Sequence, residues 1–253
     1  MCLNMPAEQR IDRSSYPKTG IHYDTSRRTV GEMLHLFFNI QKQGIENLDT
    51  LAGKPAVFVY FPHTGMGDIL IAQHVLCESG ITNLFVQGAE DYWFHNPRKL
   101  LLANLVTPIF PLPRQTVDPS VGMDDIQDAM SLQIGLINND KLSVLLSPEG
   151  TRSNLPADKR TVHSGFAQLA LQTQVPVVPI IIAGYENVLP KGTSIPHFLK
   201  FTGLPHPDYR QRVGVVIGEP IDTTGFEDNS SSRKALTAQA KKIFLKTYDA
   251  IHQ

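Results

Sequence analysis

The chain has 253 residues, of which 42% are hydrophobic, and this length suits one α/β domain with a sizeable core. A formal net charge of −1 provides no broad basic field, which argues against nucleic acid as the main partner. The two cysteines, Cys2 and Cys77, indicate no disulfide framework, so we expect a reducing compartment.

The first 26 residues are polar and without periodicity, and we expect them to form an N-terminal tail. They lack the apolar core of a signal peptide, and no stretch of the chain approaches the roughly 20 apolar residues of a membrane span. We therefore expect a cytoplasmic protein whose contact with a membrane is peripheral.

Residues 27–50 are expected to be an amphipathic helical segment. Thr29 and Glu32 have the spacing of a capping box, and the apolar residues that follow mark one helical face, namely Val30, Met33, Leu34, Phe37 and Ile40. A helix of this kind either lies in a membrane interface or packs on its own domain, and the sequence leaves both possibilities open.

Residues 51–253 alternate between apolar strands and helices, which predicts a single α/β domain with a mixed, mostly parallel sheet flanked by helices. Pro111 and Pro113 exclude the strand expected at 109–114 from the middle of the sheet. Strands are expected at 56–61, 83–87, 109–114, 142–146, 175–182 and 213–217, and helices at 68–78, 97–105, 124–137, 164–173 and 232–251.

The first turn with chemical interest follows the strand at 56–61 and carries His63 and Asp68. Gly65 and Gly67 supply the backbone freedom for a tight turn, which would bring the imidazole and the carboxylate together. The pair then reads as a general base and the group that orients it. A purely structural interpretation competes with this one. In it, Asp68 caps the next helix, and the ring of His63 only makes structural hydrogen bonds at the end of the strand.

The second such turn follows the buried strand at 142–146. Glu149 and Arg152 flank Gly150 at the carboxyl end of that strand, where an arginine is well suited to bind a planar or tetrahedral anion. Taken alone, the turn is equally typical of a solvated polar loop.

With both turns considered, the chain resembles the glycerolipid acyltransferase family, typified by lysophosphatidate acyltransferase. Four blocks carry the resemblance in the family's order, and four ordered blocks are more specific than any one motif. They are His63–Asp68, Ile109–Arg114, Pro148–Ser153 and Val175–Gly184. Pro62 stands where the family commonly has asparagine before the histidine, which leaves the acceptor open.

The resemblance implies transfer of a fatty acyl group from a thioester to a hydroxyl of a glycerol phosphate or a lysophospholipid. It implies that His63 is the general base, that Asp68 orients it, and that Arg152 and Arg114 hold the acceptor's phosphate. The donor thioester would be acyl-CoA or an acyl carrier protein.

The resemblance further implies that Glu149, Gly150 and Thr151 shape the acceptor site. No cofactor beyond the thioester co-substrate and no metal is implied. The expected partners are the donor, the acceptor and a membrane surface with which the protein associates peripherally.

Three alternatives remain open on the sequence. A thioester or lipid hydrolase would use the same base on water, and a non-catalytic relative would bind lysolipid without consuming a thioester. A metal site built from His63, Asp68 and His74 is possible on spacing alone, although these residues match no recognised ligand pattern.

Overall fold

The structure is a computed structural model that describes residues 12–16, 22–51, 53–65, 67–115, 117–185 and 211–251. The tail expected over residues 1–26 lies largely outside the described residues, and so does the long loop expected between residues 185 and 210. Within the described ranges, no helix is both long enough and apolar enough to cross a membrane.

The centre of the molecule is a seven-stranded sheet in the order β1-β7-β6-β2-β5-β3-β4. The pairs β1–β7, β6–β2, β2–β5, β5–β3 and β3–β4 are parallel, and β6–β7 is antiparallel. The strands are β1 (Phe38–Gln43), β2 (Val57–Phe61), β3 (Leu84–Ala89), β4 (Ile109–Leu112), β5 (Ser143–Leu146), β6 (Val177–Ala183) and β7 (Gln211–Ile217).

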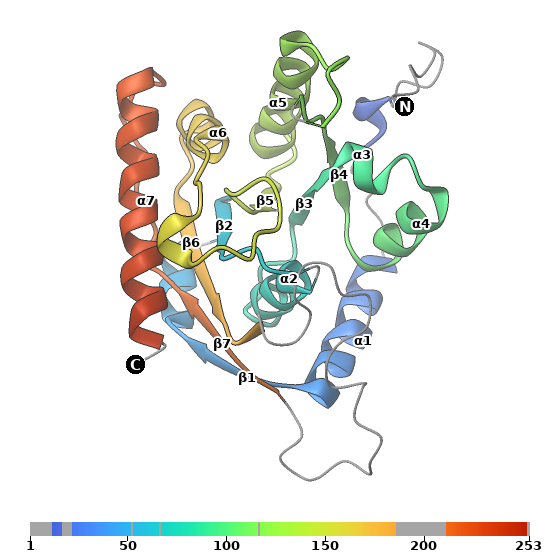
Figure 1. Ribbon diagram of the computed structural model, residues 1–253, viewed down its shortest axis with the longest axis vertical. Helices are drawn as coiled ribbons and strands as arrows, with labels where there is room; N and C mark the ends of the chain where they lie inside the picture. Colours follow the sequence, from blue (N-terminus) through green and yellow to red (C-terminus); the bar gives the residue numbers. More distant parts are fainter. Residues whose placement is uncertain are drawn as a thin grey trace.

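Helices connect the strands and cover both faces of the sheet (Figure 1). They are α1 (His22–Phe37), α2 (Asp68–Glu78), α3 (Glu90–Trp93), α4 (Pro97–Val106), α5 (Met123–Asn138), α6 (Gly165–Thr173) and α7 (Ser230–Ile251). Short 3-10 helices occur at Arg13–Ser15, Ile45–Leu51 and Ala157–Lys159. The expected mixed, mostly parallel α/β sheet flanked by helices is therefore confirmed.

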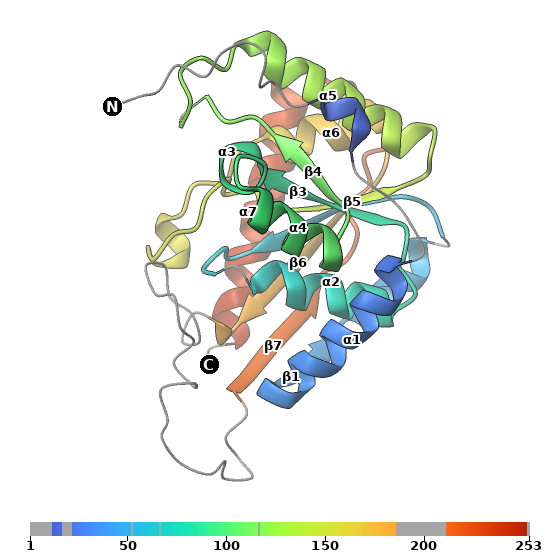
Figure 2. The same cartoon turned by 90° about the vertical axis from the view of Figure 1, so that its right-hand side faces the viewer.

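The two faces of the sheet bury separate hydrophobic cores. Along β2, Phe58 and Tyr60 belong to the core shared with α1 and α2, whereas Val57, Val59 and Phe61 belong to the core beneath α5, α6 and α7. The two groups of helices lie on opposite sides of the sheet in Figure 2. Because both faces are covered, the central strands are buried throughout, as expected for β5 from its lack of alternation.

The amphipathic helical segment expected over residues 27–50 is interrupted by a strand, and its helix begins earlier than expected. The α1 helix begins at His22, upstream of the capping-box spacing, and gives way at Phe38 to strand β1. Phe38 and Ile40 are buried and Asn39 is exposed, which is the period-two pattern of an edge strand. The main chain of β1 pairs with β7, a partner about 170 residues away that local periodicity cannot reveal.

The parallel strands β2 to β6 bring their carboxyl ends to one edge of the sheet. In open α/β sheets this edge holds the ligand site. The loop after β2 carries His63, the loop after β5 carries Glu149 and Arg152, and Arg114 follows β4. The edge position of β4, expected from its prolines, is confirmed.

Candidate active site

His63 and Asp68 are in contact across the turn between β2 and α2. The Nδ1 atom of His63 lies 3.2 Å from Oδ2 of Asp68. The Asp68 side chain is fully buried, while 19% of the His63 side chain is exposed. The imidazole therefore has one ring nitrogen against a buried carboxylate and part of its surface open to a substrate.

The turn itself holds the Asp68 carboxylate in place. The backbone N–H groups of Thr64 and Gly65 donate to Oδ2 at 2.6 and 2.8 Å, and the Thr64 hydroxyl donates to Oδ1 at 3.2 Å. Asp68 is also the first residue of α2, where the helix dipole favours a negative charge. The alternative in which Asp68 caps the helix is wrong, because Gly67 is the N-cap residue and the Asp68 carboxylate accepts from the turn before the helix.

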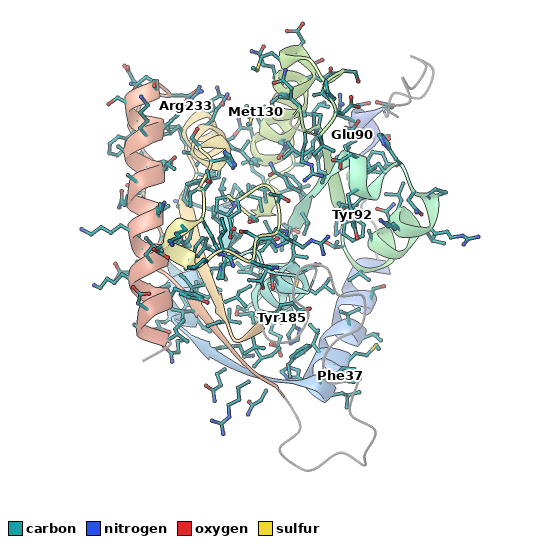
Figure 3. The ribbon with its side chains drawn as sticks, in the orientation of Figure 1. Phe37, Glu90, Tyr92, Met130, Tyr185 and Arg233 are labelled. Carbon is teal, nitrogen blue, oxygen red and sulfur yellow. The ribbon has the colours of Figure 1, made fainter. Side chains whose placement is uncertain are left out.

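Gly67 has a different role from the expected one. Its φ of −82° is open to any residue, so the turn does not depend on glycine's conformational freedom at this position. A Cβ atom there would lie 1.9 Å from the hydroxyl oxygen of Tyr185, the residue that follows β6 (Figure 3). Close packing against Tyr185 is therefore what requires a glycine before Asp68.

The loops after β2 and β5 are joined by direct hydrogen bonds. The backbone N–H of His63 donates to Oε1 of Glu149 at 2.6 Å, and the N–H of Ser153 donates to the His63 carbonyl at 3.0 Å. Arg160 completes the junction, because its Nη1 donates to the same carbonyl at 3.2 Å and to Oε2 of Glu149 at 3.1 Å. The backbone of His63 is thus held from two sides by the second loop.

Glu149 and Arg160 form a buried ion pair, with side-chain exposures of 3% and 6%. Burial raises the pKa of Glu149, and the N–H of His63 and the guanidinium of Arg160 oppose that rise. The resemblance predicts that Glu149 shapes the acceptor site, but its side chain is almost completely buried. We infer that its contribution is to set the position of His63 rather than to touch the acceptor.

Tyr60, on β2, lies behind the imidazole. Its hydroxyl is 3.4 Å from Nδ1 of His63, and the two rings meet edge to face. Burial raises the pKa of Tyr60 well above its usual value, and the charges of Asp68 and Glu149 act in the same direction. Tyr60 therefore stays a neutral phenol that limits how the His63 ring can turn.

Arg114 is fully engaged with other protein groups on two sides. Its Nε and Nη2 donate to the two carboxylate oxygens of Asp91 at 2.8 and 2.6 Å, and its Nη1 donates to the Gly150 carbonyl at 3.3 Å. Gly150 has a φ of +67°, which favours glycine at the turn. Arg114 thus ties the end of β4 to the loop after β5.

Arg152 has a different environment from Arg114. Its guanidinium carbon lies 5.7 Å from the centre of the Tyr92 ring on α3 (Figure 3), and within the described part of the chain it has no hydrogen bond or ion pair. The side chain is half-buried, and its charge acts on Tyr60 at the base of the turn. Arg152 is therefore a cation, close enough to Tyr60 to act on its pKa, whose N–H donors are available to a ligand. Thr151 and Gly150, next to it, are exposed.

Several residues at this edge were not found from the sequence. Arg160 lies seven residues beyond the Pro148–Ser153 block, and nothing in its neighbourhood marks it as the partner of Glu149. Asp91 and Tyr92 follow β3. They could have been found from the rule that the carboxyl ends of parallel strands share one edge of the sheet. Tyr60 was read only as a strand residue.

The metal site considered from His63, Asp68 and His74 is not formed. Among the described residues, the only group of three with metal-ligating atoms close together is His35, His74 and Glu78. His74 thus faces α1 rather than the turn that carries His63 and Asp68.

The contribution of the buried Glu149–Arg160 pair to stability can be tested by substitution. We expect Arg160→Met to lower the free energy of unfolding by about 3–5 kcal/mol, because the Glu149 carboxylate is left buried without its cation. Burial raises the pKa of Glu149 and Arg160 opposes that rise, so the pKa rises further in the variant, and the variant loses more stability than the wild type as the pH rises through it. The deficit should therefore be larger at neutral pH than in acid, as measured by urea unfolding.

The double variant Glu149→Gln/Arg160→Met is the matched control. It removes the uncompensated charge, so it should be more stable than Arg160→Met alone. A single variant that loses less than about 1 kcal/mol, or a double variant that is no better, would contradict a tightly coupled pair.

Comparisons with known proteins show which family the chain resembles. The family model described as Acyltransferase matches residues 39–183, which include both loops of the site. A 1-acyl-sn-glycerol-3-phosphate acyltransferase from Limnanthes alba is 29% identical over 155 residues, covering 56% of this chain and 50% of that protein. The protein of the same name from Limnanthes douglasii is 33% identical over 143 residues, covering 52% and 46%. The chain thus spans about half the length of these curated relatives.

The fold also has a counterpart of known structure. The crystal structure of the 1-acyl-sn-glycerophosphate (LPA) acyltransferase PlsC from Thermotoga maritima matches with a TM-score of 0.60 at 18% identity, covering 91% of this chain and 78% of that one. At that identity the likeness shows a shared fold. Because the family model matches more than half of the residues, the chain belongs to the acyltransferase family.

Proposed function

We propose that the chain is an O-acyltransferase of the 1-acylglycerol-3-phosphate type, which moves a fatty acyl group from a thioester to a hydroxyl of a glycerol phosphate or a lysophospholipid. The observation that carries this proposal is the contact between Nδ1 of His63 and the buried carboxylate of Asp68 at 3.2 Å. The family match and the names of the curated relatives support the same reaction.

In this proposal His63 acts as the general base. The Nδ1–H group donates a hydrogen bond to the Asp68 carboxylate, which stays ionised. The Nε2 lone pair is then free to take the proton of the acceptor hydroxyl as that oxygen attacks. Removal of a proton during attack is worth roughly 10²- to 10⁴-fold in rate. The oxygen–carbonyl bond forms, the carbon–sulfur bond breaks, and the proton passes from His63 to the departing thiolate.

Arg152 is proposed to bind the acceptor's phosphate. On the loop that is hydrogen-bonded to the backbone of His63, its guanidinium lies over the Tyr92 ring. A phosphate would give it the charge-assisted hydrogen bonds that the described protein groups do not supply. Gly150 and Thr151 form the exposed rim of this acceptor loop. Arg114, which the resemblance places at the phosphate, is paired with Asp91, and its bond to the Gly150 carbonyl keeps the acceptor loop in place.

The donor is proposed to be acyl-CoA or an acyl carrier protein, and the protein is proposed to work at a membrane surface as a peripheral protein. Exposed apolar side chains on α1 and α4, two helices that pack together, support the second proposal. They are Met33, Leu36 and Leu101, with 53%, 59% and 63% of their surface exposed. A lysophospholipid acceptor is found at such a surface.

His63→Ala tests the proposed base. We expect the variant to keep its fold, because the side chain is partly exposed, and to lose about 10²- to 10⁴-fold in turnover. Purified protein is incubated with lysophosphatidate and acyl-CoA, thiol release is followed with and without the acceptor, and the products are identified by mass spectrometry. His95→Ala, at an exposed histidine after α3, is the control and should retain full activity.

Near-normal turnover by His63→Ala would contradict the assignment. Thiol release that does not depend on the acceptor would identify a hydrolase. Binding of lysophosphatidate by the wild type without thioester consumption would identify a lysolipid-binding protein.

Arg152→Ala tests the proposed phosphate contact. We expect KM for lysophosphatidate to rise at least tenfold with little change in KM for acyl-CoA, because the lost charge-assisted bonds are made to the acceptor alone. Arg98→Ala, at an exposed arginine of α4, is the control. Equal effects on both substrates, or none on the acceptor, would place the phosphate elsewhere.

A further inference from the structure

Two histidines and a glutamate converge at the contact between α1 and α2. His35 comes from α1, and His74 and Glu78 lie one helical turn apart on the same face of α2. The Nε2 atoms of the two imidazoles are 3.0 Å apart. Glu78 Oε2 lies 3.1 Å from Nε2 of His74, and Oε1 lies 3.7 Å from Nε2 of His35.

These separations match those between the ligands of a tetrahedral metal ion. Nitrogen and oxygen ligands lie about 2.0–2.2 Å from zinc, so any two of them are about 3.3 to 3.6 Å apart at the tetrahedral angle. The two imidazole nitrogens are 3.0 Å apart, and the separations to Glu78 are 3.1 Å from Oε2 and 3.7 Å from Oε1. One ligand atom from each of the three residues lies within 4.8 Å of the other two. Neutral imidazoles and a carboxylate are also the ligand types that zinc takes.

We propose that His35, His74 and Glu78 form a binding site for a divalent transition-metal ion, with zinc the best match. The three side chains supply three ligands, and the fourth position is open to water because His35 and Glu78 are partly exposed. The site is separate from the acyl-transfer proposal, since none of its ligands belongs to the catalytic turn.

The packing of the two helices sets the direction of the His74 ring. Gly31 on α1 lies against it, so close that a Cβ atom at that residue would be 2.4 Å from Nδ1 of His74. The ring is buried, and with its Nδ1 side against α1 its Nε2 is directed at His35 and Glu78. Two helix backbones therefore hold one ligand in place before a metal arrives, which lowers the entropic cost of binding.

The protonation states of the cluster suit metal binding. Burial lowers the pKa of His74, although Glu78 opposes the shift, so the neutral, ligating form is favoured. Burial works against ionisation of Glu78, but its pKa is lowered, with the hydrogen bond from Lys42 the largest of the opposing contributions.

Lys42 is compatible with a bound metal. Its Nζ donates to Oε2 of Glu78 at 2.7 Å, so a metal bound through Oε1 leaves this bond intact. Carboxylate ligands are commonly held by such an outer hydrogen bond, which fixes their orientation. The positive charge of Lys42 would repel the metal ion and so weaken its binding.

A bound metal would clasp α1 onto α2. The α2 helix begins at Asp68, so the metal would link α1 to the helix that carries the carboxylate in contact with His63. Metal that binds the folded protein and not the unfolded chain raises the midpoint of thermal unfolding.

Cobalt(II) titration of the purified full chain tests the site, because tetrahedral cobalt gives strong visible absorption. We expect one equivalent of cobalt to bind with tetrahedral bands, zinc to displace it, and zinc to raise the midpoint of thermal unfolding. Loss of an outer partner typically costs 10- to 100-fold in metal affinity, so His35→Ala and Glu78→Gln, which each remove a ligand, should cost at least as much. His95→Ala is the matched control and should bind as the wild type does.

His35 and Glu78 are partly exposed, so their variants should fold, which circular dichroism verifies. Cobalt or zinc affinity that is the same in the wild type, His35→Ala and Glu78→Gln would overturn the proposal. So would the absence of tetrahedral bands in the wild type, which would leave the two imidazoles joined only by a hydrogen bond. Neither result bears on acyl transfer, because the readouts are spectroscopic and thermal.

Discussion

The contact between the His63 ring and the Asp68 carboxylate is the interaction on which the site depends. A buried carboxylate is costly unless its oxygens are hydrogen-bonded, and here two backbone N–H groups, a hydroxyl and the imidazole share that task. The turn can therefore keep a negative group at 0% exposure directly behind a histidine. An imidazole held in this way presents its other nitrogen to whatever enters the site.

The position of that histidine is set by a second loop as well as by its own. Glu149 and Arg160 hold the backbone of His63 from the loop after β5. Arg114, which follows β4, donates to the Gly150 carbonyl of that loop and is itself paired with Asp91 on α3. This arrangement requires parallel strands, because only then do the loops after β2, β3, β4 and β5 meet at one edge. The sheet thus brings the loop that carries His63 and the loop that carries Arg152 to the same edge.

Much of this fold could be predicted from the sequence, because its elements are locally strong. The α2 helix was expected at exactly the residues where it occurs, since its apolar residues repeat at helical spacing. The β1 strand was missed because its pairing partner, β7, lies far along the chain, and the helical pattern that runs up to Ile40 masked the alternation of Phe38 and Ile40. The periodicity of apolar residues indicates which face of a helix or strand is buried, but it does not indicate which strand will be its neighbour in the sheet.

The site was predictable to a similar degree. His63, Asp68 and Arg152 were marked by their turns at strand ends, and the structure brings the first two into contact. Arg160 and Tyr60 were not marked, because their roles come from contacts across 97 residues of sequence and from burial behind a ring. The reason for Gly67 was wrong, since its requirement arises from Tyr185, which only the folded chain places there.

The most direct test of this account is the tautomer of His63, read from the ring ¹⁵N resonances of the labelled protein and assigned by comparison with His63→Gln. The account predicts a proton on Nδ1 and a bare Nε2 in the neutral ring, a preference that weakens when Asp68 is changed to asparagine. A neutral ring with its proton on Nε2, or a tautomer that does not respond to Asp68→Asn, would contradict it.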